Sequence, residues 1–295
     1  MLEIKRVSDQ EFGWAKILIF GEAGSGKTHL ASTYPADKIL FINVVSESGL
    51  MTLRSKGFDC DVVDVSGYVQ MFDTLTYLKT QAHKYELIYI DSLSQWQKAL
   101  EGEIPECKGN KFEKWNKIKE LTKQIVDLIK EVPCHVVSTC EIQRDKDEES
   151  GGYLFLPSLL GSSREQISYW FDEVYFLNRT SQKPNAPITY SMLTSAGSKY
   201  PCKSRMNLQQ VIEKPNLEEI IKNAGFKKEK GEPIKEEKET LSDLETIANK
   251  LISLETMEDL TAYFNTFKNP TDEIKSLFTM RKEKIKENQD DNTIN

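Results

Sequence analysis

The stretch that decides the fold is Lys16-Ile17-Leu18-Ile19-Phe20-Gly21-Glu22-Ala23-Gly24-Ser25-Gly26-Lys27-Thr28. Residues 16–20 form a short apolar run, which indicates a buried strand, and the glycine-rich segment after it matches GxxxxGK[ST]. A helix is expected from Lys27 to about Tyr34, because Pro35 then ends it. A strand, a glycine-rich loop and a helix in this order predict a phosphate-binding loop.

The residue types of this loop suit a nucleotide. Its glycines let successive N–H groups converge on a β-phosphate, and the positive end of the following helix points to the same place. Lys27 is expected to bridge the β- and γ-phosphates, and the Thr28 hydroxyl to ligate Mg²⁺. The cofactors predicted are therefore ATP and Mg²⁺, and the alternative is a glycine-rich turn without a ligand. The predicted nucleotide-binding residues are Gly21, Glu22, Ala23, Gly24, Ser25, Gly26, Lys27, Thr28 and His29.

Further short runs rich in Val and Ile follow the loop. They predict strands over 39–44, 61–65, 87–90 and 135–139, with helical patterns between them over 69–83 and 112–132. This alternation predicts an α/β sheet with right-handed crossovers. Beyond the fifth strand, residues 172–178 and 187–194 read as two strands joined by a loop over 179–186, which predicts a β-hairpin extension of the sheet.

The same reading divides the chain into three parts. The core is predicted to span residues 1–226. Residues 227–240 are charged and almost free of apolar side chains, as is typical of a linker. Residues 241–295 carry apolar residues at helical spacing, which predicts a small helical appendage whose tail, from Lys284, is frayed.

Composition limits the protein class. The chain has 295 residues, 39% hydrophobic and 29% charged, and no window approaches the roughly 18 apolar residues of a membrane-spanning helix. Its N-terminus is charged where a signal peptide is apolar, so a cytoplasmic protein is expected. Five cysteines without a CxxC pair and three histidines indicate neither a disulfide framework nor a zinc site. With a net charge of −7, any nucleic-acid binding must come from a local basic surface or from oligomerisation.

A second motif supplies an acid for the metal. Leu87-Ile88-Tyr89-Ile90-Asp91 is an apolar strand that ends in an acid, the form of a Walker B segment, and Asp91 is expected to hold Mg²⁺ through water. Because Ser92 follows and not a glutamate, the catalytic base must come from elsewhere.

RecA-like ATPases place the catalytic glutamate just beyond the strand that follows the phosphate-loop helix. Glu47 is therefore the first candidate for the base, and Glu141, beyond the strand at 135–139, is the second. Thr139 is expected to sense the γ-phosphate. The alternative for Glu47 is a solvent-exposed acid in a loop. The alternative for Thr139 is that a β-branched residue stands there only because such residues favour strands.

Five segments together resemble the phage nucleotide-binding proteins of the RecA-like class, which are ATPases related to phage single-strand annealing proteins. They are GEAGSGKT (21–28), LIYIDSLSQW (87–96), HVVSTCE (135–141), LPSLLGSSREQISYWFDEVYFL (156–177) and KSR (203–205). The resemblance covers about residues 17–226 and implies a RecA-like P-loop NTPase core that acts on single-stranded DNA in recombination or replication, by annealing or strand exchange. In that family the second strand runs directly into an acid, whereas here Ile42 is followed by Asn-Val-Val-Ser-Glu.

RecA-like ATPases work as rings or filaments, so a homo-oligomer is expected. Lys203 and Arg205 are then candidates for charges inserted into a neighbour's site, where they would stabilise the transition state. The alternative is a solvated basic turn. Arg164 is a candidate contact to phosphate or DNA. The C-terminal helices are a candidate docking site for a single-strand-binding protein or another replication partner.

Two segments contain candidate residues for contact with DNA. The segment 112–117 and the loop 143–153 carry basic and aromatic residues of the kind that contact single strands, although Trp115 is expected in the core and acids occupy part of the loop. Two other functions stay open at this point. One is a P-loop kinase of a small molecule, and the other is an ATP-binding regulatory protein that hardly hydrolyses.

Overall fold

The computed structural model describes most of the chain. The described residues are 13–45, 49–105, 111–146, 151–180, 188–197, 199–206, 208–223, 250–251, 254, 256–265, 267, 274–275, 278–279 and 281–282. Two compact units divide the chain, residues 1–234 and 235–295. Glu47 and the linker predicted at 227–240 lie outside the described residues.

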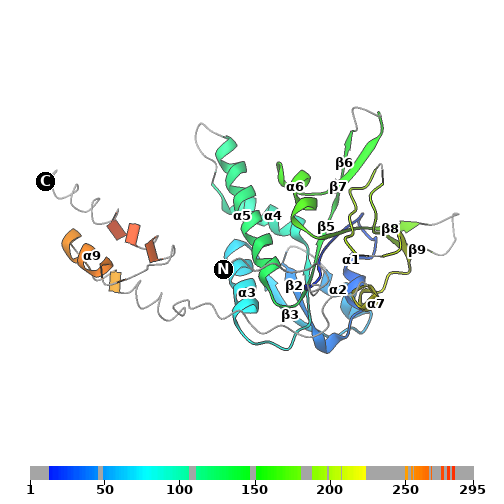
Figure 1. Ribbon diagram of the computed structural model, residues 1–295, viewed down its shortest axis with the longest axis horizontal. Coiled ribbons are helices and arrows are strands. Elements are labelled where there is room, and N and C mark those ends of the chain that lie inside the picture. The colour runs from blue at the N-terminus through cyan, green and yellow to red at the C-terminus, as the bar shows by residue number, and fades with distance from the viewer. Residues whose placement is uncertain are drawn as a thin grey trace, which may run out of the picture. The chain divides into compact units, whose positions relative to one another are not determined.

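An eight-stranded sheet forms the centre of the first unit (Figure 1). The strand order is β10-β9-β8-β1-β5-β4-β2-β3, and every pair from β8 to β3 is parallel, while β9 and β10 are antiparallel. The prediction of a mainly parallel sheet with a β-hairpin extension is confirmed. The strands are β1 (Lys16–Phe20), β2 (Ile39–Val44), β3 (Asp61–Val65), β4 (Leu87–Asp91), β5 (His135–Cys140), β8 (Glu173–Thr180), β9 (Thr189–Leu193) and β10 (Val211–Glu213).

Helices cover both faces of this sheet, because the side chains of each strand alternate between the faces. Leu18 and Phe20 of β1 join one apolar cluster with residues of α3 to α6, whereas Ile17 and Ile19 join a second with residues of α1, α2 and α7. The helices of this unit are α1 (Lys27–Ala31), a short 3₁₀ turn (Ala36–Lys38), α2 (Gly49–Ser55), α3 (Tyr68–Thr80), α4 (Leu93–Glu103), α5 (Lys111–Glu131), α6 (Ser163–Trp170) and α7 (Leu217–Asn223).

Four elements differ from the sequence-based expectation. Around the loop expected at 143–153, β6 (Ile142–Lys146) and β7 (Tyr153–Pro157) pair as a separate antiparallel hairpin. Both strands are only partly buried, and β6, with the sequence Ile-Gln-Arg-Asp-Lys, lacks the apolar run of a central strand. The helix α4 was not expected, and β3 is a mostly exposed edge strand although parallel strands are usually covered on both faces.

The second unit contains the helix α9 (Met257–Phe264). Thr256 caps it by accepting a hydrogen bond from the Asp259 backbone N–H at 3.1 Å. Leu260 packs in a small apolar cluster with Leu251, Ile274 and Phe278. Across the described parts of both units, no helix combines the length and apolar character needed to cross a membrane.

Candidate nucleotide-binding site

The phosphate-binding loop connects β1 to α1 through glycines that other residues would not replace. Gly24 and Gly26 have φ angles of 73° and 94°, in the left-handed region that favours glycine. A Cβ atom at Gly21 would lie 2.4 Å from the Leu177 backbone oxygen, so the neighbouring strand β8 excludes a side chain there. Because Gly26 has no side chain to cap α1, the first N–H groups of the helix are suited to bind an anion.

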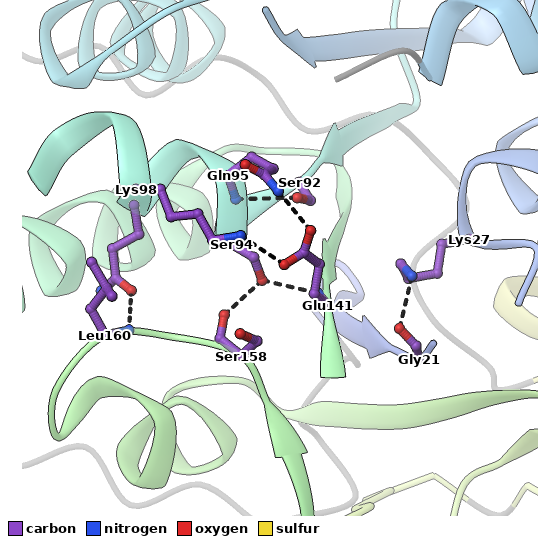
Figure 2. Close-up of polar contacts among 10 residues, drawn as sticks. Gly21, Lys27, Ser92, Ser94, Gln95, Lys98, Glu141, Ser158 and Leu160 are labelled. Atoms are coloured by element: carbon purple, nitrogen blue, oxygen red, sulfur yellow. Dashed lines mark hydrogen bonds and ion pairs between the residues drawn. The ribbon is translucent and has the colours of Figure 1, made fainter. Parts of the chain in front are cut away.

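Lys27 lies over this loop. Its Nζ donates a hydrogen bond to the backbone oxygen of Gly21 at 2.8 Å (Figure 2). It donates another to the backbone oxygen of Glu22 at 3.0 Å. The buried hydroxyl of Tyr89 donates to the Lys27 backbone oxygen and fixes the start of α1 against β4. The ammonium is thereby placed where a phosphate oxygen would meet both it and the loop N–H groups.

A chain of hydrogen bonds joins three predicted site residues. The Thr28 hydroxyl donates to Asp91 Oδ2 at 2.6 Å, and the Thr139 hydroxyl donates to Asp91 Oδ1 at 2.6 Å. Asp91 is 2% exposed, so its carboxylate has one fixed orientation. Thr139 therefore acts on the site through Asp91, and its expected contact to the γ-phosphate stays a prediction.

The donor set around Asp91 fits Mg²⁺. A hydroxyl and a carboxylate are hard oxygen ligands, and Mg²⁺ usually takes only one or two protein groups beside waters and phosphates. A Cβ at Gly49 would lie 3.0 Å from Asp91 Oδ2 and 3.3 Å from Thr28 Cγ2, so glycine at the start of α2 keeps this space open. The described residues contain no cluster of three or more His, Cys, Asp or Glu that could hold a metal by itself.

Asp91→Asn is expected to raise the Mg²⁺ concentration needed for half-maximal ATP turnover by about 10- to 100-fold, since an amide is a poorer metal partner. An asparagine keeps one oxygen acceptor and the side-chain shape, so the fold is expected to persist. A magnesium titration of ATP turnover measures the effect, with Asp61→Asn, at an exposed carboxylate on β3, as the control. Identical titration curves for Asp91→Asn and wild type would exclude the metal role.

Glu141, the second candidate base, lies between β5 and β6 with its carboxylate already bound (Figure 2). Gln95 Nε2 donates to Oε1 at 2.6 Å and Lys98 Nζ to Oε2 at 2.9 Å. Burial raises the pKa of this carboxyl, but the hydrogen bonds from Lys98 and Gln95 and the charge of Lys27 outweigh it and leave the pKa below its usual value. Glu141 is therefore ionised at neutral pH and is a weak proton acceptor.

The other loop residues have diverse surroundings. Ser25 is 1% exposed, and its Oγ has no hydrogen-bond partner among the described residues. Burial and the charge of Lys56 lower the pKa of His29, so its imidazole, which contacts Ser32, is neutral at pH 7. Glu22 forms an exposed ion pair with Arg144 of β6 at 2.9 Å, and Ala23 is exposed.

Lys203 and Arg205 make contacts within their own chain. The Lys203 ammonium donates to the backbone oxygens of Ser168, at 2.7 Å, and of Phe171, so it caps the C-terminal end of α6. Burial and the charge of Arg205 lower its pKa. Arg205 pairs with Asp172 at 2.7 Å and has 65% of its side chain exposed. Their role toward a neighbouring subunit stays a prediction.

The residues considered for DNA lie outside the loop. Phe112 is 78% exposed and Trp115 39% exposed, so the expectation that Trp115 packs in the core is wrong. Its ring instead covers the turn at Gly161, whose Cβ would lie 3.8 Å from the indole. Arg164 pairs with Asp145 of the β6–β7 hairpin at 3.3 Å.

Two residues near the loop were missed. A Cβ at Gly24 would lie 3.0 Å from Arg179 Nη1, and a Cβ at Gly26 would lie 3.3 Å from the Tyr190 ring. Both side chains come from the β8–β9 ribbon, where Arg179 and Tyr190 are opposite one another. Their positions more than 150 residues along the chain gave no local signal for this contact.

One family model matches the part of the chain that contains this site. A family model described as an AAA domain matches residues 14–206, which is more than half of the chain. Among solved structures, a KaiC-like protein from the hyperthermophilic archaeon Pyrococcus horikoshii OT3 is similar, at 14% identity and a TM-score of 0.38, over 68% of this chain and 89% of that chain. No curated protein matches the chain. The matched residues include the phosphate loop, Asp91 and Thr139, and the chain belongs to this family of AAA domains, which are P-loop nucleoside triphosphatases.

Proposed function

We propose that the protein is a Mg²⁺-dependent ATPase that acts on single-stranded DNA in phage recombination or replication, by annealing or strand exchange. The observation that carries the ATPase part is the hydrogen-bonded chain Thr28–Asp91–Thr139 beside the Lys27 ammonium. Lys27 and the loop N–H groups would bind the β- and γ-phosphates, and Asp91 and Thr28 would hold Mg²⁺. Mg²⁺, when bound, supplies charge neutralisation for the transferred phosphoryl group.

The DNA part is supported by the hairpin β6–β7. It extends from the end of β5 and away from the sheet (Figure 1). Arg144 and Lys146 are exposed on it, and Tyr153 is 60% exposed, which provides cations for phosphates and a ring for a base. The ion pair between Arg144 and Glu22 joins this hairpin to the phosphate loop, so a ligand on the hairpin can influence the nucleotide site. The resemblance of segment 156–177 to phage proteins supports the same partner.

Assembly into a ring or filament belongs to the same proposal. Arg205 is the stronger candidate for a charge inserted into a neighbour's site, because its guanidinium is largely exposed while the Lys203 ammonium caps α6. The partner expected for the helices of the second unit, a single-strand-binding protein or another replication protein, stays a prediction.

ATP hydrolysis by the full-length protein is expected to increase several-fold on addition of single-stranded DNA, and Tyr153→Ala is expected to abolish most of that increase, because a stacked base contributes roughly 1–3 kcal/mol. A steady-state assay with and without an oligonucleotide measures both effects. Tyr77→Ala, at a tyrosine of α3 that is 56% exposed, is the matched control.

The same assay separates the other functions. ADP formation that requires a small-molecule acceptor would identify a kinase, and ATP binding without turnover would identify a regulatory protein. Hydrolysis that DNA leaves unchanged would contradict the DNA part of the proposal alone.

A further inference from the structure

A groove of about 240 Å³ lies between two helical walls of the second unit. One wall is α9, and the second wall is formed by residues between 274 and 282, which are helical where they are described. On each wall the lining residues have the spacing i, i+3, i+4 and i+7, which places them on one face of their helix. They are Met257, Leu260, Thr261 and Phe264 on α9, and Lys275, Phe278, Thr279 and Lys282 on the second wall.

The floor of the groove is apolar. Leu260 and Phe278 are 4% and 6% exposed, and they belong to the apolar cluster that joins the two walls. Met257 and Phe264 pack against this cluster and are only partly buried, so apolar surface of α9 stays open in the groove. Two helices that leave an open apolar groove between them offer the surface on which an amphipathic helix lays its own apolar face.

One edge of the groove is basic. Lys275 and Lys282 are exposed on the second wall, two helical turns apart, which is about 10 Å along the axis. Acids outnumber basic residues in residues 235–295 as a whole, yet none of the described lining residues is acidic. The acids in the first turn of α9, Glu258 and Asp259, lie outside the lining, and Asp259 accepts a hydrogen bond from the Thr256 hydroxyl at 2.7 Å. The groove is therefore a cationic surface in an acidic unit, and it is complementary to a negatively charged ligand.

The second wall is fixed by hydrogen bonds that do not involve the lysine side chains. Arg281 donates to the Leu254 backbone oxygen from Nη2 at 2.6 Å and from Nε at 3.0 Å. The Thr279 hydroxyl donates to the Lys275 backbone oxygen at 2.9 Å, within the helix. Arg281 therefore holds the second wall against the segment before α9, while Lys282, the next residue, lines the groove.

We propose that this groove binds an acidic amphipathic helix of a partner protein. The apolar stripe of that helix lies on Phe264 and Phe278, and two of its carboxylates, two turns apart on one edge of the stripe, pair with Lys275 and Lys282. Burial of the apolar side chains supplies most of the affinity, whereas the exposed ion pairs select an acidic partner and set its orientation. The proposal does not depend on nucleotide or DNA binding, because every lining residue belongs to the second unit.

Selection from a display library of helical peptides tests the chemistry of the partner. The library peptides share a stripe of leucines and have random residues along both edges of the stripe, and they are selected on the full-length protein without nucleotide. The bound peptides are expected to be enriched in Asp or Glu at two edge positions that are two helical turns apart. Bound peptides without this enrichment would overturn the proposal. A selection without any bound peptide would also overturn it, since this is the result expected if a second copy or this chain itself fills the groove.

Charge reversal then locates the bound peptide. The double variant Lys275→Glu, Lys282→Glu is expected to raise the dissociation constant of a selected peptide about tenfold, because repulsion replaces attraction, and fluorescence anisotropy measures the change. A peptide with lysines in place of its two acids is expected to recover most of the affinity for this variant, which a merely structural defect would not allow. The double variant Lys84→Glu, Lys222→Glu, at exposed lysines of the first unit, is the matched control. Equal affinity of both double variants for the selected peptide, or no recovery by the lysine peptide, would overturn the proposal and leave the proposed ATPase function in place.

Discussion

Lys27→Ala is expected to lower the affinity for ATP at least a hundredfold and to leave the fold intact. The ammonium lies over the loop, where it contacts the backbone oxygens of Gly21 and Glu22. Phosphate oxygens would replace these carbonyl groups as its partners. Loss of one charged donor at such a site costs about 3 kcal/mol, which is a factor of at least a hundred in affinity.

Binding of a fluorescent ATP analogue measures the change, and the thermal unfolding midpoint checks the fold. Lys84→Ala is the matched control, because it removes the same charge from an exposed ion pair with Asp61, 2.7 Å long, on the edge of the sheet. A folded Lys27→Ala protein with wild-type affinity would show that the phosphate loop does not bind the nucleotide.

The central sheet was predictable because strands that are buried on both faces appear in the sequence as short runs of apolar residues. The four strands predicted after the loop, at 39–44, 61–65, 87–90 and 135–139, match β2 to β5 to within one residue at each end. The loop was equally clear, since its glycines and its Lys-Thr pair are contiguous in sequence. Local signals were enough for features that lie within one short segment.

The helix α4 shows a local signal that was present and overlooked. Ser92 and Gln95 have the Ser-x-x-Gln spacing of a capping box, and the Ser92 hydroxyl accepts from the Gln95 N–H at 3.3 Å. The hairpin β6–β7 differs. The strand β6 carries the charged residues Arg144, Asp145 and Lys146 and lacks an apolar run, whereas β7 has the short apolar run Tyr-Leu-Phe-Leu, which was not recognised as a strand.

The cavity of about 310 Å³ beside the phosphate loop could not be predicted from the sequence. One part of its wall comes from the loop and α1, and the other comes from the β8–β9 ribbon and the turn at Lys214, which are far from the loop in the sequence. The capping role of Lys203 was hidden for the same reason, since it depends on α6 ending beside β8. Contacts of this kind are set by the sheet order and not by any single segment.

Both the sequence and the structure bear on whether Glu47 or Glu141 is the catalytic base. Glu47 lies outside the described residues, but the residues around it are informative. Asn43 of β2 is opposite Asp91 of β4, and Gly49 begins α2 against the Asp91 carboxylate. Asn43 and Gly49 therefore both lie beside Asp91, and Glu47 stands between them in the sequence. Glu141 in contrast has both carboxylate oxygens engaged by Gln95 and Lys98.

Glu47→Gln is accordingly expected to slow ATP hydrolysis by at least about a hundredfold while the affinity for ATP stays within twofold, because a general base acts after the substrate is bound. Glu141→Gln keeps one side-chain oxygen that can accept a hydrogen bond from Gln95 or Lys98. It is expected to reduce the rate of ATP hydrolysis much less than Glu47→Gln does. Single-turnover hydrolysis at saturating ATP, together with the dissociation constants, separates the two variants, and Glu165→Gln on the exposed side of α6 is the control. If Glu141→Gln loses hydrolysis and Glu47→Gln does not, the base lies at the end of β5, and the charge of Lys98 must then move away from the carboxylate during each turnover for it to accept a proton.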